Sequence, residues 1–361
     1  MSGASGTSGY AVVVPTLGRP SLDACLAALA AAEGPPPARV VLVDDRPLDD
    51  CHPLPVQVPP RLADRVETVP SLAGGPAVAR NTGWRAVKEP WVVFLDDDTV
   101  PGPYWARELT ADLAAAGPGT AAVQGVIDVP LPPDRRPTDW ERGTAGLARA
   151  AWITADLACR REALESVGGF DERFPRAFRE DADLALRLMD AGWQLRHGRR
   201  HTTHPVRPAP GPWASLRAQR GNQDDALMTR LHGRDWWTRA RAPRGRLPRH
   251  AAVTAAGAGA IVALACGGRR VAAASVLGWA LGTGEFAWKR IAPGPRTVEE
   301  IRAMVLTSLA IPPAACAHWL LGWARHRTAR PWTAPQARPR AEGDAEAGAG
   351  ADADAVGREA A

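Results

Sequence analysis

A run of five apolar residues that leads directly into three aspartates constrains the fold of this chain more than any other segment. Trp91–Leu95 (WVVFL) is followed by Asp96, Asp97 and Asp98, and Pro101 then ends regular structure. A short apolar run between such breakers is typical of a fully buried strand in a parallel sheet, whose carboxyl end opens where ligands bind. Because adjacent carboxylates repel one another, the pattern predicts a bound divalent cation. The alternative is a strand followed by a solvated acidic turn.

The composition is that of a folded protein with one large domain or two ordinary ones. Hydrophobic residues make up 45% of the 361 residues, which excludes a wholly disordered chain, and the net charge is only +5. The basic residues do not interleave with aromatic residues, so we expect no nucleic-acid partner. The five cysteines form no Cys-x-x-Cys pair, which favours a reducing compartment over disulfides or a zinc site. Residues 1–9 do not resemble a signal peptide.

The N-terminal segment predicts a strand–helix–strand unit. The first strand is expected at Tyr10–Val14 and ends at Pro15, and a helix capped by Ser21 follows to about Ala32. Val40–Val43 is the second expected strand. This spacing is typical of two parallel strands joined by a right-handed crossover.

The second strand also ends in acidic residues, Asp44 and Asp45. In a parallel sheet the carboxyl ends of the strands face the same edge. We therefore expect these two carboxylates to lie close to Asp96 and Asp98. That convergence makes a ligand site more credible than either acidic cluster would alone.

Further elements follow the same alternating pattern. A helix at 77–87 carries Arg80 and Asn81 in its first turns, where free N–H groups and the helix dipole favour phosphate; the alternative for Arg80 is a solvated helix face. The segment Phe178–Asp183 opens a later helix, and its adjacent Glu180 and Asp181, with Asp183 beyond, exceed the acidic residues that dipole compensation needs. The remaining elements are expected as strands at 66–69, 121–129 and 193–195, and as helices at 104–116, 161–167 and 213–231.

Six short motifs, in this order and spacing, resemble those of the family 2 glycosyltransferases. The resemblance covers roughly residues 10–233, about two thirds of the chain. It implies an α/β fold of the GT-A type, a Rossmann-like nucleotide-diphospho-sugar transferase domain, followed by an α-helical region. The motifs are Val12–Thr16, Val43–Asp45, Ala79–Asn81, the DxD motif in Phe94–Asp98, Gly168–Glu172, and Arg179–Asp181.

The resemblance implies an inverting, metal-dependent transfer of a sugar from a nucleotide diphosphate sugar to an acceptor hydroxyl. Asp181 would be the general base, with Glu180 as the neighbouring candidate. Asp96 and Asp98 would bind Mg²⁺ or Mn²⁺, with His204 as the third ligand and His201 as the second choice. Contacts to the nucleotide sugar are implied for Pro15, Thr16, Arg19, Asp44, Asp45, Arg80, Asn81, Asp96 and Asp97.

On the acceptor side the resemblance implies roles for Asp156, Phe170 and Asp171. The family often has asparagine where this chain has Asp156, which puts the acceptor contacts in question but not the fold. The acceptor itself is left open between a glycan and a lipid-linked molecule, as is the identity of the nucleotide and the sugar. Cell-envelope glycan or glycolipid synthesis is the expected setting.

The last third of the chain changes character. Residues 251–267, 271–288 and 303–324 are apolar runs flanked by arginines and lysines, and Pro312-Pro313 interrupts the third. These flanks suit an anionic lipid surface, so we expect the region to attach the protein to the cytoplasmic face of the cell membrane. A helical subdomain packed on the catalytic domain is the soluble alternative. Basic residues follow every run and define no consistent topology, which a tight hairpin or interfacial helices would reconcile.

Two other functions fit part of this pattern: a haloacid-dehalogenase-like phosphatase using Asp96 and Asp98, and a non-catalytic GT-A scaffold. The phosphatase would need a suitably placed lysine, and Lys88 and Lys289 are the only ones.

The expected division of the chain follows from these features. The expected segments are a disordered N-terminus (1–9), the glycosyltransferase domain (10–235), a basic linker (236–250), the apolar helical region (251–328) and a disordered tail (329–361).

Overall fold

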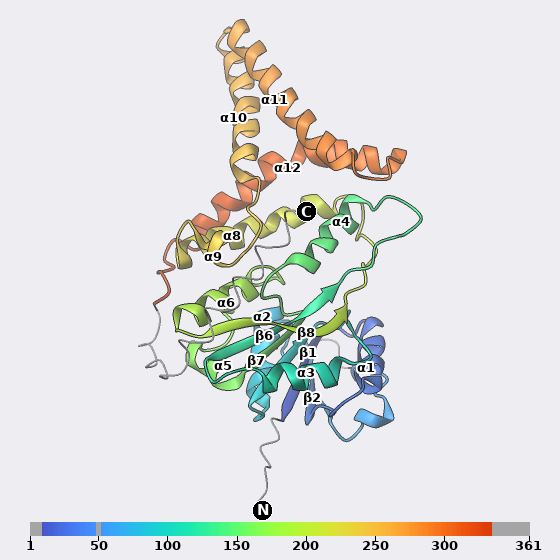
Figure 1. The fold of residues 1–361 in the computed structure, drawn as a ribbon. Helices are drawn as coiled ribbons and strands as arrows, with labels where there is room; N and C mark the ends of the chain where they lie inside the picture. Colours follow the sequence, from blue (N-terminus) through green and yellow to red (C-terminus); the bar gives the residue numbers. More distant parts are fainter. Residues whose placement is uncertain (1–8, 48–51, 334–361) are drawn as a thin grey trace, which may run out of the picture.

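A computed structural model describes residues 9–47 and 52–333 of the chain. One eight-stranded sheet lies between two layers of helices, and three long helices extend from one end of this body (Figure 1). The expected tails lie outside the described residues, except for Gly9 and residues 329–333. The latter run beside the body, where the Trp332 amide donates to the Leu231 carbonyl (3.0 Å).

The strands alternate with helices along most of the chain. In order, the strands are β1 (Tyr10–Thr16), β2 (Arg39–Asp44), β3 (Val66–Pro70), β4 (Trp91–Leu95), β5 (Val100–Pro101), β6 (Thr120–Asp128), β7 (Asp156–Arg160) and β8 (Gln194–Thr203). The helices are α1 (Ser21–Ala31), α2 (Pro76–Ala86), α3 (Trp105–Ala114), α4 (Asp139–Ala145), α5 (Arg161–Val167), α6 (Glu180–Asp190), α7 (Ala214–Arg217), α8 (Asn222–His232), α9 (Trp236–Arg239), α10 (Leu247–Ala265), α11 (Arg269–Ile291) and α12 (Val298–Arg325).

The sheet is mixed, and the expectation that β4 lies in a purely parallel sheet is wrong. The strand order is β3-β2-β1-β4-β7-β6-β8-β5. β4 pairs in parallel with β1 but antiparallel with β7, where Leu95 faces Asp156. An apolar run indicates that both faces of the strand are buried. It does not indicate strand direction, because a strand can be buried equally well beside a parallel or an antiparallel neighbour. The ends of β1, β2, β4, β6 and β8 nevertheless share one edge, because β7 is antiparallel to both β4 and β6, so these five strands run in the same direction.

The core consists of two apolar layers, one on each face of the sheet. Val12 and Val14 pack with α1 and α3, whereas Ala11 and Val13 pack with α2, α5 and α6. This alternation follows from the two-residue period of a strand. All residues of β4 are buried, as the apolar run predicts.

Several local expectations differ from the structure. β1 continues through Pro15, which lies beyond the residues of β1 that pair with β4, so its missing N–H costs no bond there. Ser21 is the first helical residue rather than the cap, and its hydroxyl has no hydrogen-bond partner among the described residues. Pro101 forms part of the short strand β5 instead of ending regular structure.

Another difference concerns the helix expected at 213–231. It is divided into α7, a 3₁₀ turn η3 (Ala218–Gly221) and α8. In the C-terminal region, α12 runs without a break through Pro312 and Pro313. Packing of Ile311, Pro312 and Ala315, all buried, supports the helix at the point where the prolines remove its backbone bonds.

Asp156 lies at the centre of a buried polar network and not on an acceptor-binding surface. It is fully buried at the start of β7. Its Oδ1 accepts from Arg200 Nε (2.8 Å), and its Oδ2 accepts from Trp105 Nε1 (2.7 Å) and from the Thr202 hydroxyl (2.6 Å). Arg200 is itself fully buried and also donates to the Val123 carbonyl. The network therefore joins α3, β6, β7 and β8.

We expect Asp156→Ala to destabilise the protein by about 3–5 kcal/mol, because it leaves the Arg200 guanidinium buried without its carboxylate. The measurement is the free energy of unfolding in urea. The matched control is Asp171→Ala, which removes a carboxylate paired with the exposed Arg173 and should change stability by about 1 kcal/mol or less. Equal losses in the two variants would contradict a structural role for Asp156.

Candidate active site

The three aspartates after β4 take two different positions. The Thr99 amide and hydroxyl both donate to the Asp96 carbonyl, which closes a tight turn. Asp97 is buried inside this turn, where its carboxylate accepts from the Thr16 hydroxyl (2.8 Å) and Arg19 Nη1 (3.1 Å). The turn leaves Asp96 and Asp98 to converge on the neighbouring cavity. The middle aspartate thus holds the end of β1 to the end of β4.

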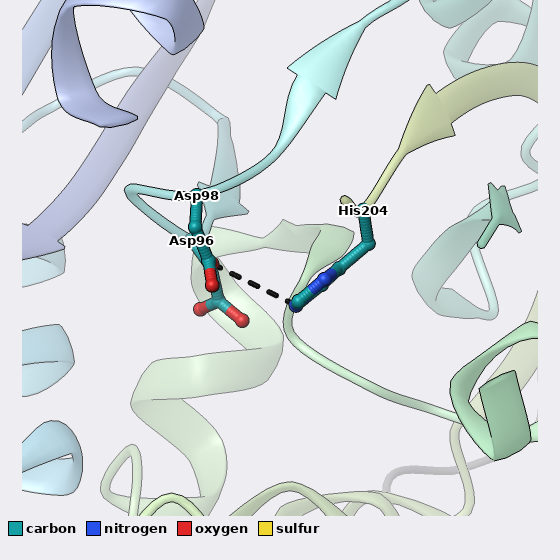
Figure 2. A group of neighbouring side chains, drawn as sticks. All are labelled: Asp96, Asp98 and His204. Carbon is teal, nitrogen blue, oxygen red and sulfur yellow. Dashed lines mark ion pairs between the residues drawn. The ribbon is translucent and has the colours of Figure 1, made fainter. Parts of the chain in front are cut away.

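His204 joins these two carboxylates through the pairing of β5 with β8. Val100 lies opposite Thr203, so the residue after β8 is placed beside Asp98. Ligand atoms of Asp96, Asp98 and His204 lie within 4.8 Å of one another, and Figure 2 shows the three side chains converging. His204 Nε2 is 3.6 Å from Asp98 Oδ1. His201, the second choice, instead pairs with Asp128 at the exposed end of β6 (2.7 Å).

This trio has the chemistry of a divalent cation site. Burial raises the pKa of Asp98, the nearby Asp96 and Asp97 carboxylates raise it further, and His204 and Arg207 oppose that rise. Asp98 Oδ2 is buried and accepts no hydrogen bond from any described residue, although Arg207 Nε lies 2.8 Å away. Two carboxylates and an imidazole fit Mn²⁺, and the two carboxylates alone fit Mg²⁺ with its retained waters.

Arg80 connects the candidate cation site to the start of α6. Its Nη2 donates to Asp96 Oδ1 (2.9 Å) and its Nη1 to Glu180 Oε1 (2.8 Å). The side chain is only 3% exposed, and its guanidinium lies 5.8 Å from the centre of the Phe170 ring. Arg80 thus has two carboxylate partners inside the protein, and the solvated helix face is excluded.

The acidic pair at the start of α6 is strongly perturbed. Burial raises the pKa of Glu180 to about 8, the charge of Asp181 adds to this, and Arg80 opposes it. Burial also raises the pKa of Asp181, whereas the Ala182 amide, Arg80 and Arg179 stabilise its ionised form. Glu180 Oε2 is buried and accepts no hydrogen bond from the described residues. Perturbed carboxyl groups of this kind are typical of functional sites.

Arg179 sets the position of this pair. Its backbone is left-handed (φ 77°), which is uncommon for a residue other than glycine. Its Nε donates to Asp225 Oδ1 of α8 (2.8 Å), and its guanidinium lies over the rings of Trp236 and Trp237. These contacts hold a strained backbone at the residue that immediately precedes α6.

The residues expected to contact a nucleotide sugar fall into two groups. One group lines a single cavity of about 1080 Å³: Pro15, Thr16, Arg19, Asp45, Arg80, Asp96 and Asp97. Within it, Asp45 also accepts from the Ser71 hydroxyl (2.7 Å) and from the Gly75 amide at the start of α2. Asp44 and Asn81 are not part of the described cavity wall. Asp44 pairs with Arg46 (2.7 Å).

Asn81 and the residues expected on the acceptor side form a structural junction. The Asn81 side chain accepts from the Phe170 amide and donates to the Phe170 carbonyl (2.9 Å each). Phe170 packs edge-on against Phe94 in the core, and Asp171 pairs with Arg173. Gly169 has a left-handed backbone (φ 77°), and a Cβ there would lie 2.5 Å from Asn81 Oδ1. None of these residues belongs to the described wall of the cavity.

The cavity extends well beyond the residues that the sequence indicated. Arg207, which pairs with Asp98, lines it, and Trp140 of α4 donates to the Arg207 carbonyl (2.8 Å). Other parts of the wall come from segments distant in sequence, whose contribution no local pattern indicates. These lining residues are Thr138, Asp139, Trp140, Gly143 and Thr144 of the α4 region, Ala214, Ser215, Ala218 and Gln219 of α7 and η3, and Thr297, Glu299, Glu300, Ala303 and Met304 at the start of α12.

Two family models match the segments that build this site. The model described as glycosyl transferase family 2 matches residues 11–143, and the model described as glycosyl transferase family group 2 matches residues 91–221. Together the matches span residues 11–221, and this part of the chain belongs to the family 2 glycosyltransferases. Both matches include the Asp96–Asp98 turn, and the second extends through His204 and Arg207.

Curated relatives agree with this family. The chain is 31% identical over 134 residues to a pre-mycofactocin glycosyltransferase of Mycobacterium tuberculosis, covering 34% of this chain and 28% of that protein. It is 32% identical over 152 residues to an N-acetylglucosaminyl-diphospho-decaprenol L-rhamnosyltransferase of the same organism, covering 40% and 38%. The chain thus spans about a third of the length of the curated relatives it matches.

The fold also matches a solved structure. A mannosyltransferase from Pyrobaculum calidifontis, in complex with GDP-Man and Mn²⁺, aligns with a TM-score of 0.52 over 86% of each chain at 20% identity. The expected GT-A fold followed by a helical region is therefore confirmed. The phosphatase alternative finds no support: both family matches are glycosyltransferases, and no lysine belongs to the described cavity wall.

We expect Arg207→Gln to tighten Mn²⁺ binding about fivefold, because the guanidinium beside Asp98 repels the Mn²⁺ ion. The effect is no larger because Arg207 is half exposed and solvent screens its charge. Isothermal titration calorimetry of the full chain without nucleotide measures the dissociation constant. Arg161→Gln, which removes a guanidinium paired with Glu165 on α5, is the matched control and should leave it unchanged. Weaker Mn²⁺ binding in Arg207→Gln would show that Arg207 supports the cation site instead of opposing it.

Proposed function

We propose that this protein transfers a sugar from a nucleotide diphosphate sugar to an acceptor hydroxyl, with inversion at the anomeric carbon and with a divalent cation. The observation that carries the proposal is the meeting of Asp96, Asp98 and His204 at a cavity whose wall is joined through Arg80 to Glu180. Diphosphate departure requires neutralisation of developing negative charge, and acceptor attack requires a base. The two halves of the site offer these two functions.

The residues take the following roles in this proposal. Asp96, Asp98 and His204 hold Mg²⁺ or Mn²⁺, which when bound neutralises the charge of the leaving diphosphate. Thr16, Arg19, Asp45 and Asp97 line the part of the cavity assigned to the nucleotide. Arg80 keeps Glu180 and Asp96 at a fixed separation.

Asp181 accepts the proton of the acceptor hydroxyl. Glu180 is the less suitable base, since one of its oxygens is already bound to Arg80. Asp181 is partly exposed, and no described residue forms such an ion pair with it. Its raised pKa makes the ionised carboxylate more basic than an ordinary aspartate, which favours proton transfer.

A lipid-linked or envelope glycan is the proposed acceptor, at the cytoplasmic face of a membrane. One relative is named for a decaprenol-linked acceptor. α10 and α12 are long and apolar enough to cross a membrane by length and composition. The start of α12 also lines the cavity, so the apolar region and the proposed site are continuous.

The proposal is tested by a thermal-shift and calorimetric screen of the full chain against UDP, GDP and dTDP, each with and without Mn²⁺. We expect one nucleotide to stabilise the protein only when the cation is present, because the cation would offset the repulsion between the diphosphate and the two aspartates. Asp98→Asn should abolish this shift, whereas Asp134→Asn, in the exposed loop before α4, should not. If no nucleotide stabilises the protein with Mn²⁺ present, the donor class proposed here is wrong.

We expect Asp181→Asn to lower the transfer rate about 10²–10⁴-fold without abolishing nucleotide binding, because only the base is lost. The measurement is the release of nucleoside diphosphate from a sugar donor that carries the nucleotide found to stabilise the protein. A membrane lipid extract serves as the acceptor. Asp190→Asn, at the other end of α6, is the matched control. In the unchanged protein the rate should rise with pH through an apparent pKa above that of an ordinary aspartate, since the base acts only when ionised. An unchanged rate in Asp181→Asn would remove Asp181 from this role.

A further inference from the structure

The helices α10 and α11 form a hairpin that projects away from the catalytic body (Figure 1). Their seam is closely packed through small residues. A Cβ on Gly257 would lie 3.1 Å from Trp279, and one on Gly282 would lie 2.5 Å from Val253. Small residues at such seams let helix backbones approach in the absence of water. The hairpin is therefore a defined two-helix unit.

The outer surface of this hairpin is apolar and uncovered. Ile261 is 71% exposed and Leu281 is 65% exposed, whereas only His250 and Ala260 of α10 are buried. Further exposed apolar side chains occur on both helices: Val262, Leu264, Val271, Val276, Leu277 and Trp288. Exposed apolar surface on this scale marks an interaction site.

The charges of the hairpin lie only at its two ends. Residues 251–265 of α10 and 271–284 of α11 contain no charged side chain, and each stretch is about 22 Å long. At the base, Glu285 pairs with Arg246, Arg249 and Lys289. At the tip, Arg269 and Arg270 follow the turn at 266–268. Extended basic side chains at both ends match this apolar length to a hydrocarbon core of about 30 Å.

The longest helix, α12, has a different relationship to the body. Its mean hydropathy of 1.5 exceeds the 1.2 of α10, so composition alone favours it as a span. It is nevertheless bound to the catalytic body: Gln223 contacts His318 (3.0 Å), and Arg230 donates to the Trp323 carbonyl and lies over that ring. A Cβ on Gly322 would lie 2.6 Å from the α8 backbone. These contacts prevent α12 from crossing a bilayer.

One face of α12 remains apolar and exposed. Figure 1 shows α12 lying across the base of the hairpin, between the hairpin and the catalytic body. Its exposed apolar residues are Val298, Ile301, Val305, Leu306, Leu309, Leu320 and Leu321. A helix with one face on the protein and the other apolar and uncovered is suited to the headgroup boundary of a membrane.

We propose that α10 and α11 cross a bilayer with anionic headgroups as a hairpin, with Cys266, Arg269 and Arg270 emerging on the side opposite the catalytic body. α12 lies in the headgroup layer on the side of the catalytic body. This inference refines the membrane attachment in the proposed function. A tip that stopped within the bilayer would leave two arginines in hydrocarbon, which is unfavourable. The cavity, whose wall includes the start of α12, then lies next to the membrane surface.

Cys266 at the tip permits a direct test, because it is exposed and Cys25 and Cys159 are buried. The full chain with Cys51→Ser and Cys316→Ser is expressed in bacteria, and sealed spheroplasts are treated with a membrane-impermeant maleimide before and after lysis. The matched control carries Cys266→Ser together with Ala111→Cys, on the exposed surface of α3. We expect Cys266 and Ala111→Cys to be labelled from opposite sides of the membrane.

Labelling of both positions from the same side would overturn the hairpin span, as would recovery of the protein in the soluble fraction. Labelling of Cys266 only in detergent would place the tip within the bilayer and would also overturn the hairpin span.

The position of α12 is tested with a fluorophore attached to Leu321→Cys. Lipids spin-labelled near the headgroup should quench its fluorescence more than lipids labelled at the chain end; the reverse order would contradict an interfacial helix. Nucleotide stabilisation of the same preparations tests the catalytic proposal separately, so failure of either is distinguishable.

Discussion

The buried guanidinium of Arg80, held between Asp96 and Glu180, is the interaction on which the site depends. Arg80 comes from the first half of the α/β body, Asp96 from the end of β4 and Glu180 from the start of α6. A buried cation is tolerated only with its carboxylates in place, and each carboxylate is likewise costly to bury alone. The two hydrogen bonds of Arg80 therefore favour one arrangement, in which the candidate cation site and the start of α6 lie at a fixed separation.

The sheet brings the remaining groups to this point. Every strand that ends near the cavity runs in the same direction, and the reversal at β7 provides Asp156, whose network supports the sheet from inside. The short pairing of β5 with β8 then places His204 beside Asp98. Arg207, three residues later, contacts the same carboxylate. The pairing of the two-residue strand β5 with β8 therefore positions both His204 and Arg207 beside Asp98.

The C-terminal helices are connected to the site through α12 and Arg290. The Arg290 guanidinium donates to Asp139 of α4 (2.8 Å), to Ser215 of α7 (2.8 Å) and to Thr307 of α12 (2.8 Å). Asp139 also lines the cavity. Arg290, near the end of α11, thus links the hairpin to the wall of the cavity through charged hydrogen bonds.

The sequence by itself determined the buried strand at 91–95, the convergence of acidic strand ends, the family and the apolar character of the last third. Each depends on local periodicity or on short motifs. Only the tertiary structure decided that Asp156 and Asn81 form buried hydrogen bonds within the protein and that Arg80 bridges two carboxylates. It also decided that His204 rather than His201 joins the aspartates. It also separated α12 from the hairpin, although composition ranks α12 as the more hydropathic helix. The physical reason is that side-chain partners come from distant segments, and neither hydropathy nor spacing records which surfaces meet.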